Sequence, residues 1–105
     1  FIMALPNDDV VEVAATALIG NYPNPFNPET TISYSVKELS PVKIEIYNTK
    51  GQLIRTLVNQ IQPRGFYSEI WNGTDERGNP VASGVYMYRM TAGNYRSHRK
   101  MMLIK

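Results

Sequence analysis

Few residues of this sequence have the types and spacing that catalysis or metal binding requires. His98 is the single histidine and lies in a basic stretch without an acidic neighbour, which argues against a catalytic triad and a histidine-rich metal site. Glu69 has no evident carboxylate partner for glycoside hydrolysis. Asp75, Glu76 and Asn79 share one loop, but they lack the alternating oxygen ligands and terminal glutamate of the helical calcium motif. We therefore expect no enzyme, no bound metal and no cofactor.

A basic cluster near the end of the chain raises the question of nucleic-acid binding. Arginine and lysine interleaved with tyrosine are typical of surfaces that bind single strands. The formal net charge is only +2, however, which gives little affinity from counterion release, and several of these tyrosines are needed in the core. We therefore expect no nucleic-acid partner. The cluster comprises Arg89, Arg96, Arg99, Lys100 and Lys105, with Tyr86, Tyr88 and Tyr95 nearby.

Charge is distributed unevenly along the chain. Residues 1–36 contain four acids (Asp8, Asp9, Glu12 and Glu29) and no lysine or arginine, whereas the remainder carries eleven bases and five acids. Complementary potentials steer association, so the acidic front of the chain suits contact with its own basic part or with that of a neighbour. Ordinary surface charge is the alternative interpretation.

The length and composition fit a single soluble domain. The chain has 105 residues, 43% of them hydrophobic, and no apolar run approaches the length of a membrane-spanning helix. There is no cysteine, so packing alone must stabilise the fold. Residues 1–20 lack the basic start and cleavage site of a signal peptide, and we interpret the chain as the tail of a longer protein.

Alternating apolar and polar residues predict strands along most of the chain. The residues 48–51 and 93–94 have turn chemistry and should close two hairpins, and residues 72–80 should form a long polar loop. Residues 84–92 are apolar on both faces, as in a central strand covered on both sides. The first segment could be an edge strand or a short helix, and strand is favoured. Strands are predicted at residues 10–18, 30–36, 42–47, 53–58, 66–71, 84–92 and 95–104.

These elements define an all-β fold. Seven short strands with frequent turns and no long helical period predict an antiparallel immunoglobulin-like β-sandwich of about seven strands. A small barrel is the alternative. The largest core side chains should be Trp71, Tyr67, Tyr86 and Tyr88, because aromatic residues bury the most area.

The segment "NYPNPFNP" at residues 21–28 is dense in proline and asparagine. Proline fixes its own backbone and restricts the residue before it, so this should be a stiff lead-in rather than part of a sheet interior. We expect Tyr22 and Phe26 to anchor it on the sandwich and the asparagines to cap exposed backbone. The predicted division is therefore a strand-prone extension, or the end of a preceding region, at residues 1–19 and a domain at residues 20–105.

Four stretches resemble a known family: "NYPNPFNPETTISYSV", "VKIEIYNTKGQLIRTLV", "WNGTDERGNPVASGVYMYRM" and the closing "KMMLIK". Together they resemble the C-terminal sorting domain of proteins exported by the type IX secretion system of Bacteroidetes and related bacteria. The middle portion is also similar to the immunoglobulin-like domain of flagellar hook-capping proteins. The family motif matches Asn21, Tyr22, Pro23, Asn24, Pro25, Phe26, Asn27, Gly51, Trp71, Gly73, Asp75, Gly78, Ser83, Gly84, Tyr86, Lys100 and Lys105.

The resemblance implies a non-catalytic domain that directs an extracellular protein through the outer-membrane export machinery to the cell surface, where a surface sortase cuts it from its cargo in many family members. The last strand should be available for strand addition by a partner. One departure is Glu69, where an apolar residue is expected, so either a bulge re-aims the strand or Glu69 faces a partner.

Two other functions are weighed against sorting. Residues 1–19 could instead cross to the basic sheet of the next molecule and build a head-to-tail filament, which makes self-association the alternative function. A carbohydrate-binding module would use an exposed aromatic strip formed by Tyr22, Tyr47 and Tyr95.

Overall fold

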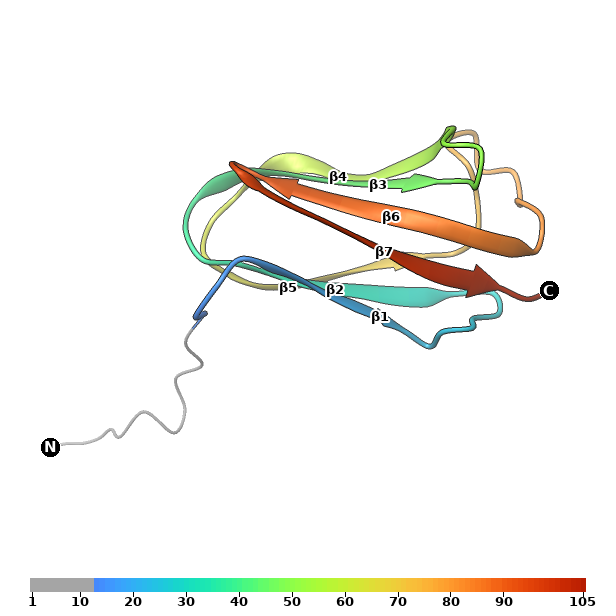
Figure 1. Cartoon of the computed structure of the whole chain (residues 1–105), viewed down its shortest axis with the longest axis horizontal. Coiled ribbons are helices and arrows are strands. Elements are labelled where there is room, and N and C mark those ends of the chain that lie inside the picture. The colour runs from blue at the N-terminus through green and yellow to red at the C-terminus, as the bar shows by residue number, and fades with distance from the viewer. Residues whose placement is uncertain (1–12) are drawn as a thin grey trace, which may run out of the picture.

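Residues 13–105, the part of the chain that the computed structural model describes, form seven antiparallel strands in two sheets. Sheet A contains β1 (Ala17–Tyr22), β2 (Thr30–Val36) and β5 (Gly65–Trp71) in the order β1-β2-β5. Sheet B contains β3 (Ser40–Tyr47), β4 (Leu53–Gln62), β6 (Gly84–Ala92) and β7 (Tyr95–Leu103) in the order β4-β3-β6-β7. The sheets lie face to face as two layers (Figure 1), which confirms the predicted immunoglobulin-like sandwich. In this part of the chain, no helix is long and apolar enough to cross a membrane.

The core lies between the two sheets and takes every second side chain from most strands. Trp71, Tyr86 and Tyr88 are buried there, as predicted. Tyr67 is also predicted there, but it is only half-buried, because it lies on the edge strand β5 and stacks on the fully buried Tyr34 at 5.3 Å. The remaining members of the core are Leu18, Phe26, Ile32, Val36, Val42, Ile44, Ile46, Val58, Met90, Ala92, Met101 and Leu103.

The first strand differs from its prediction. A strand was expected at residues 10–18, but β1 runs from Ala17 to Tyr22, while residues 13–16 precede it and residues 10–12 lie outside the described chain. The strand continues to the residue before Pro23, whose missing amide hydrogen cannot donate to a ladder. A bulge between Leu18 and Gly20 shifts its register against β2. Sequence alternation missed this strand because the bulge interrupts the period of two.

The described residues before β1 pack on their own sandwich. Val13 and Leu18 are buried, and the Ala15 carbonyl accepts a hydrogen bond from the Ser35 hydroxyl at 2.7 Å. The backbone amide of Lys37 donates to the Thr16 hydroxyl at 3.0 Å. Within the described residues, this segment therefore packs against its own chain from Val13 onward.

Strand β6 is interior to its sheet but is covered on one face only. Tyr86, Tyr88 and Met90 point into the core, whereas Arg89 on the other face is exposed and Met87 is half-buried. The prediction that both faces are covered is wrong, because the described fold has two layers and no third layer packs on sheet B.

The predicted β3–β4 hairpin forms, with a turn held by Asn48. The Gly51 amide donates to the Asn48 carbonyl at 3.0 Å, and the Asn48 side-chain oxygen accepts from the amides of Lys50 at 2.9 Å and Gln52 at 3.0 Å. Gly51 has a φ of 79°, which a residue with a Cβ rarely adopts. Beyond the turn, β4 continues to Gln62, four residues past its predicted end. Sequence alternation does not reveal that continuation, because the inward positions opposite Val42 and Ser40 are glutamines.

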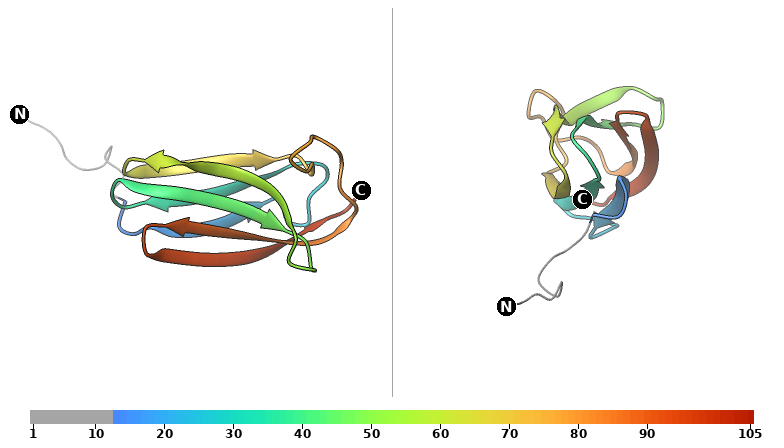
Figure 2. Two further views of the ribbon diagram at one scale, coloured as in Figure 1. Left: turned by 90° about the horizontal axis from the view of Figure 1, so that it is seen from above. Right: turned by 90° about the vertical axis from the view of Figure 1, so that its left-hand side faces the viewer.

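The strands run lengthwise, so all connections gather at two ends (Figures 1 and 2). One end holds the connections 23–29, 48–52 and 72–83 together with residues 104–105, and we call it the motif end. The other holds residues 13–16, 37–39, 63–64 and 93–94, and we call it the opposite end.

Candidate functional site

The structure gathers nearly all residues of the predicted sorting motif at the motif end. They come from five separate stretches of chain that the antiparallel topology returns to the same place. Lys100 is the exception in position, since it lies within β7, opposite Met87 of β6. At or beside this end lie Asn21, Tyr22, Pro23, Asn24, Pro25, Phe26, Asn27, Gly51, Trp71, Gly73, Asp75, Gly78, Ser83, Gly84, Tyr86 and Lys105.

The proline-rich lead-in runs parallel to the end of β7 and is bonded to it. The Phe26 amide donates to the Met102 carbonyl at 2.9 Å, and the Ile104 amide donates to the Phe26 carbonyl at 3.0 Å. The Asn24 side chain accepts from the Met102 amide at 3.0 Å and donates to the Lys100 carbonyl at 3.4 Å. The lead-in therefore already occupies the outer edge of the last strand near its end, where the sequence had suggested strand addition by a partner.

One of the two predicted aromatic anchors of the lead-in is confirmed. Phe26 is 2% exposed, and its ring lies 5.6 Å from that of Trp71, which in turn lies 5.2 Å from that of Tyr86. Tyr22 was also predicted to anchor the segment, but its side chain is exposed. Side chains alternate between the two faces along a strand, and Tyr22, which pairs with Thr31, lies on the outer side of sheet A.

The loop after Trp71 is held by side chains that bond to its backbone. The Trp71 indole donates to the Thr74 carbonyl at 2.8 Å. Arg55 of β4 donates from one guanidinium nitrogen to the Thr74 hydroxyl and to the Asp75 carbonyl, both at 2.9 Å. Arg55 was not singled out from the sequence, because it is 19 residues away from Thr74 and no local pattern links the two.

The acidic residues of this loop serve its own backbone. The Asp75 carboxylate accepts from the amides of Arg77 and Asn79, each at 2.9 Å, and Glu76 accepts from the Thr56 amide at 2.9 Å. These bonds fold the loop back onto β4. Over residues 13–105, no group of three or more acidic or histidine side chains is placed to hold a metal ion.

The chain segments of the motif end are held together by backbone conformation and hydrogen bonds. Gly73 has a φ of 74°, which a residue with a Cβ rarely adopts, and it lies against the Pro28 carbonyl and the Leu103 side chain. Ser83 accepts from the Lys105 amide at 3.0 Å, which fixes the last described residue against the loop before β6. The Tyr86 hydroxyl donates to the Ala82 carbonyl at 2.6 Å, a closure like the tyrosine corner of immunoglobulin-like domains.

Asn21 connects the two sheets beside the motif end. Its side-chain oxygen accepts from the Tyr88 hydroxyl of β6 at 2.9 Å, and its amide nitrogen donates to the Thr30 hydroxyl at 3.0 Å. Burial raises the pKa of Tyr88 to about 12, with Arg99 acting in the opposite direction. The phenol is therefore neutral and free to donate at ordinary pH.

Most of the basic cluster lies on the opposite side of sheet B from Tyr86 and Tyr88. The exception is Arg99, which pairs with Tyr88 and donates to the Leu18 carbonyl at 3.1 Å. Arg96, His98 and Lys100 occupy the exposed face of β7, whereas Tyr86 and Tyr88 point into the core. His98 is an exposed strand residue. Tyr86 and Tyr88 are therefore not available for stacking on the outer face of sheet B.

Arg89 is the most constrained cation on this face. Its guanidinium donates to Glu45 at 3.2 Å and to the Tyr47 hydroxyl at 2.8 Å, and it lies 5.1 Å from the centre of the Tyr47 ring. Burial disfavours ionisation of Glu45, but hydrogen bonds from Tyr47 and Arg89 outweigh it and keep the Glu45 pKa below its ordinary value.

Two further predictions concern Glu69 and an aromatic strip. The β2–β5 register is continuous, so the bulge proposed at Glu69 is absent, and the half-buried side chain lies on the inner side of β5. The tyrosines of the proposed carbohydrate strip are separated: Tyr22 lies on the outer side of sheet A and Tyr47 on that of sheet B. Tyr95 accepts from the Leu18 amide at 2.9 Å between the sheets.

The fold and its motif end define an immunoglobulin-like domain, and a family comparison agrees. The model of the FlgD Ig-like domain matches residues 26–95, and the chain belongs to that family. This confirms the similarity to immunoglobulin-like domains of hook-capping proteins inferred from the sequence. Comparison with curated proteins gives no match.

Two solved structures share the fold. The dimeric latent PorU from Porphyromonas gingivalis is 20% identical over 88% of this chain, with a TM-score of 0.68. PorZ, an essential bacterial surface component of the type IX secretion system of Porphyromonas gingivalis, is 23% identical over 81% of this chain, with a TM-score of 0.57. This chain spans 10% and 11% of those two proteins, respectively.

Proposed function

We propose that this domain is a non-catalytic export module that directs the protein carrying it through the outer-membrane type IX export machinery to the cell surface or exterior. The observation that carries the proposal is the convergence of the sequence motif on one end of the sandwich, around the last strand. The likeness in fold to PorZ, a surface component of that secretion system, supports the same assignment.

The export machinery would recognise a folded surface rather than a linear peptide. The lead-in, the tryptophan loop and the end of β7 become neighbours only after folding, since their contacts join residues as far apart as Asn24 and Met102. Some motif residues, including Phe26 and Trp71, are buried and act by holding this end together. The exposed ones, including Asn27 and Lys105, are the positions that a receptor or the surface sortase would touch.

A secretion assay tests the proposal. The chain is fused to the C-terminus of a reporter that carries a periplasmic signal peptide, and it is expressed in a bacterium with a type IX system and in a mutant lacking that system. We expect the reporter outside the cell in the first strain and in the periplasm of the second. Periplasmic retention in both strains, with the domain folded, would contradict the proposal.

A pair of asparagine variants then tests the motif end. Asn27→Ala changes an exposed residue of the motif end, whereas Asn59→Ala changes an exposed asparagine of β4. If the motif end is the recognised surface, Asn27→Ala lowers the exported fraction roughly fivefold or more, as expected for an interface hot spot, and Asn59→Ala does not. Equal export of both variants, at unchanged melting temperature, would show that recognition occurs elsewhere.

A further inference from the structure

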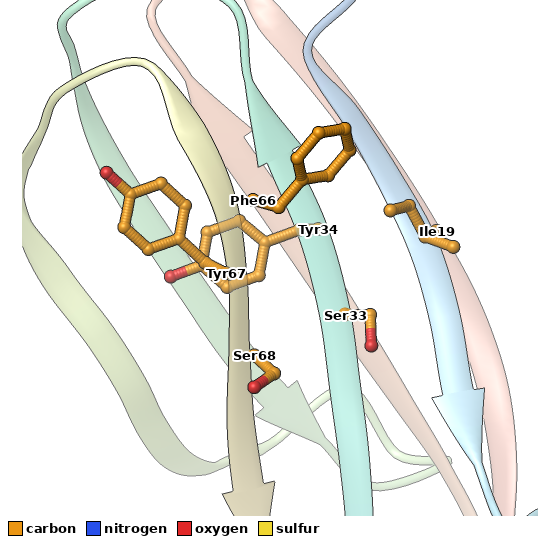
Figure 3. Close-up of a pocket in the computed structure, with 6 residues that line it drawn as sticks. All are labelled: Ile19, Ser33, Tyr34, Phe66, Tyr67 and Ser68. Atoms are coloured by element: carbon orange, nitrogen blue, oxygen red, sulfur yellow. The ribbon is translucent and has the colours of Figure 1, made fainter. Parts of the chain in front are cut away.

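The outer face of sheet A is an uncharged surface with large apolar side chains. Cross-strand register places three rows on it: Ala17, Ser35 and Phe66; Gly20, Ser33 and Ser68; and Tyr22, Thr31 and Ile70. Ile19, at the bulge in β1, joins the same face (Figure 3). None of these outward positions carries a charge. Tyr22 is 82% exposed, Ile70 59%, Phe66 53% and Ile19 50%.

The apolar side chains occupy both ends of this face, with hydroxyl groups between them. Figure 3 shows the Phe66 ring of β5 lying across β2 on the side of Ile19, with Ser33 and Ser68 farther along the strands. These residues line a shallow depression in the sheet surface. Exposed large apolar side chains gathered on one face of a sheet are typical of interaction sites.

The occupant of this face must be uncharged, because burying an unpaired charge is costly. The outer face of sheet B does not qualify, since Lys43, Arg89, Arg96 and Lys100 lie on it. Of the two outer sheet faces that residues 13–105 form, the one that qualifies is the outer face of sheet A itself. Its hydroxyl groups both donate and accept, so a serine row facing another serine row can form hydrogen bonds in either direction.

The three rows are also arranged symmetrically. Consider a two-fold axis that lies in the contact plane and runs along the serine row. It places each strand of sheet A over the same strand of the second copy, running in the opposite direction. It sets the Phe66 row of one copy over the Ile70 row of the other, and Ser33 over Ser33. Apolar side chains then meet apolar side chains at both ends, and an isologous contact of this kind closes after two copies.

We propose that two copies of this chain form a face-to-face dimer through the outer faces of sheet A. The contact is three strands wide, which is small for a protein interface, so the dimer is a weak and reversible one. The proposal goes beyond export, because it concerns a surface away from the motif end. It also needs no contribution from residues before Val13.

Sedimentation equilibrium of the full chain tests the dimer, with paired charge variants. Ser33→Arg places like charges across the two-fold axis and should weaken dimerisation roughly 100-fold or more. Thr91→Arg introduces the same charge on the outer side of sheet B and should leave the dimer constant within about twofold. A wild-type chain that remains monomeric up to about 1 mM, the weak limit of measurable affinity, overturns the proposal, as does equal weakening by both variants.

A crosslinking experiment locates the contact independently of affinity. The chain has no cysteine, so a single introduced thiol reports one position. With a short bismaleimide, Ser33→Cys should give a covalent dimer in high yield, and Thr91→Cys should give only the background expected from collisions. The melting temperatures of both variants are checked against the wild type. A dominant dimer of Thr91→Cys, or equal yields from the two variants, would place the contact elsewhere and overturn the proposal.

Discussion

Side-chain-to-backbone hydrogen bonds close both ends of the sandwich, but the opposite end adds a buried pair of polar side chains. At the motif end, polar side chains bond mainly to backbone groups, as Asn24 does with Met102 and Ser83 does with Lys105. At the opposite end, the Tyr34 hydroxyl donates to the Gln62 side chain at 3.0 Å in a buried position. This buried pair of side chains adds to side-chain-to-backbone bonds at the same end, such as that of the Ser35 hydroxyl to the Ala15 carbonyl.

The opposite end is further tied together by Tyr67. Its ring stacks on Tyr34 with an interplanar angle of 14°, and its hydroxyl donates to the Pro63 carbonyl at 2.5 Å. Burial raises the Tyr34 pKa, partly offset by the hydrogen bond with Gln62, so the phenol stays protonated and keeps donating at ordinary pH. A recognisable motif is thus not required for a well-bonded end. What distinguishes the motif end is that its bonds fix the course of the chain around the last strand.

The largest expected effect at either end is the loss of Phe26. Phe26→Ala leaves a cavity against Trp71 and should lower the free energy of unfolding by about 3–5 kcal/mol. Tyr22→Ala, in the same segment but exposed, should change it by less than about 0.5 kcal/mol. Urea unfolding at low protein concentration, where any dimer dissociates, measures both. Similar losses for the two variants would mean that the whole lead-in, rather than the Phe26 anchor, carries the stability.

The next effect concerns the polar pair at the opposite end. Gln62→Ala leaves the buried Tyr34 hydroxyl without its acceptor and should cost about 1–3 kcal/mol. Tyr34→Phe, Gln62→Leu and their double variant form a cycle with the wild type, and the double variant, which removes both polar groups, should cost less than the sum of the two single changes. Thermal or urea unfolding of all four chains completes the cycle. Strictly additive costs would show that the two side chains do not act as a pair.

The difference between the ends also explains which features of the fold and of the motif end could be predicted from the sequence. Strands β2 and β3 follow period-two patterns that are visible in the sequence, and the turn at Asn48 and Gly51 has recognisable chemistry. The motif end was visible for the same reason, because asparagine, proline and glycine are informative one residue at a time. Its assembly around β7 could not be predicted, because it depends on contacts between residues 76 or 78 positions apart along the chain.

Features that depend on three-dimensional context could not be predicted from the sequence. The bulge in β1 explains why the first strand was predicted at the wrong residues. Tyr22 is exposed because its position in the strand faces outward, although its residue type suggested burial. The pairing of Tyr34 with Gln62 spans 28 residues, and neither residue stands out from its neighbours. The uncharged face of sheet A could not be recognised before register aligned β1, β2 and β5.

The smallest effect expected is that of Asn24, and it separates local closure from global stability. Asn24→Ala removes the acceptor of the Met102 amide and should cost about 1 kcal/mol. The backbone bond from Phe26 to the Met102 carbonyl remains, so the last strand should stay in place.

Amide hydrogen exchange distinguishes these outcomes. The Met102 amide should exchange about fivefold faster in Asn24→Ala, which is the rate equivalent of that free energy, while amides at the opposite end keep their wild-type rates. Asn59→Ala, the matched exposed asparagine of β4, should leave Met102 unchanged. Faster exchange throughout sheet B would instead show that the lead-in stabilises the entire sheet rather than only the end of β7.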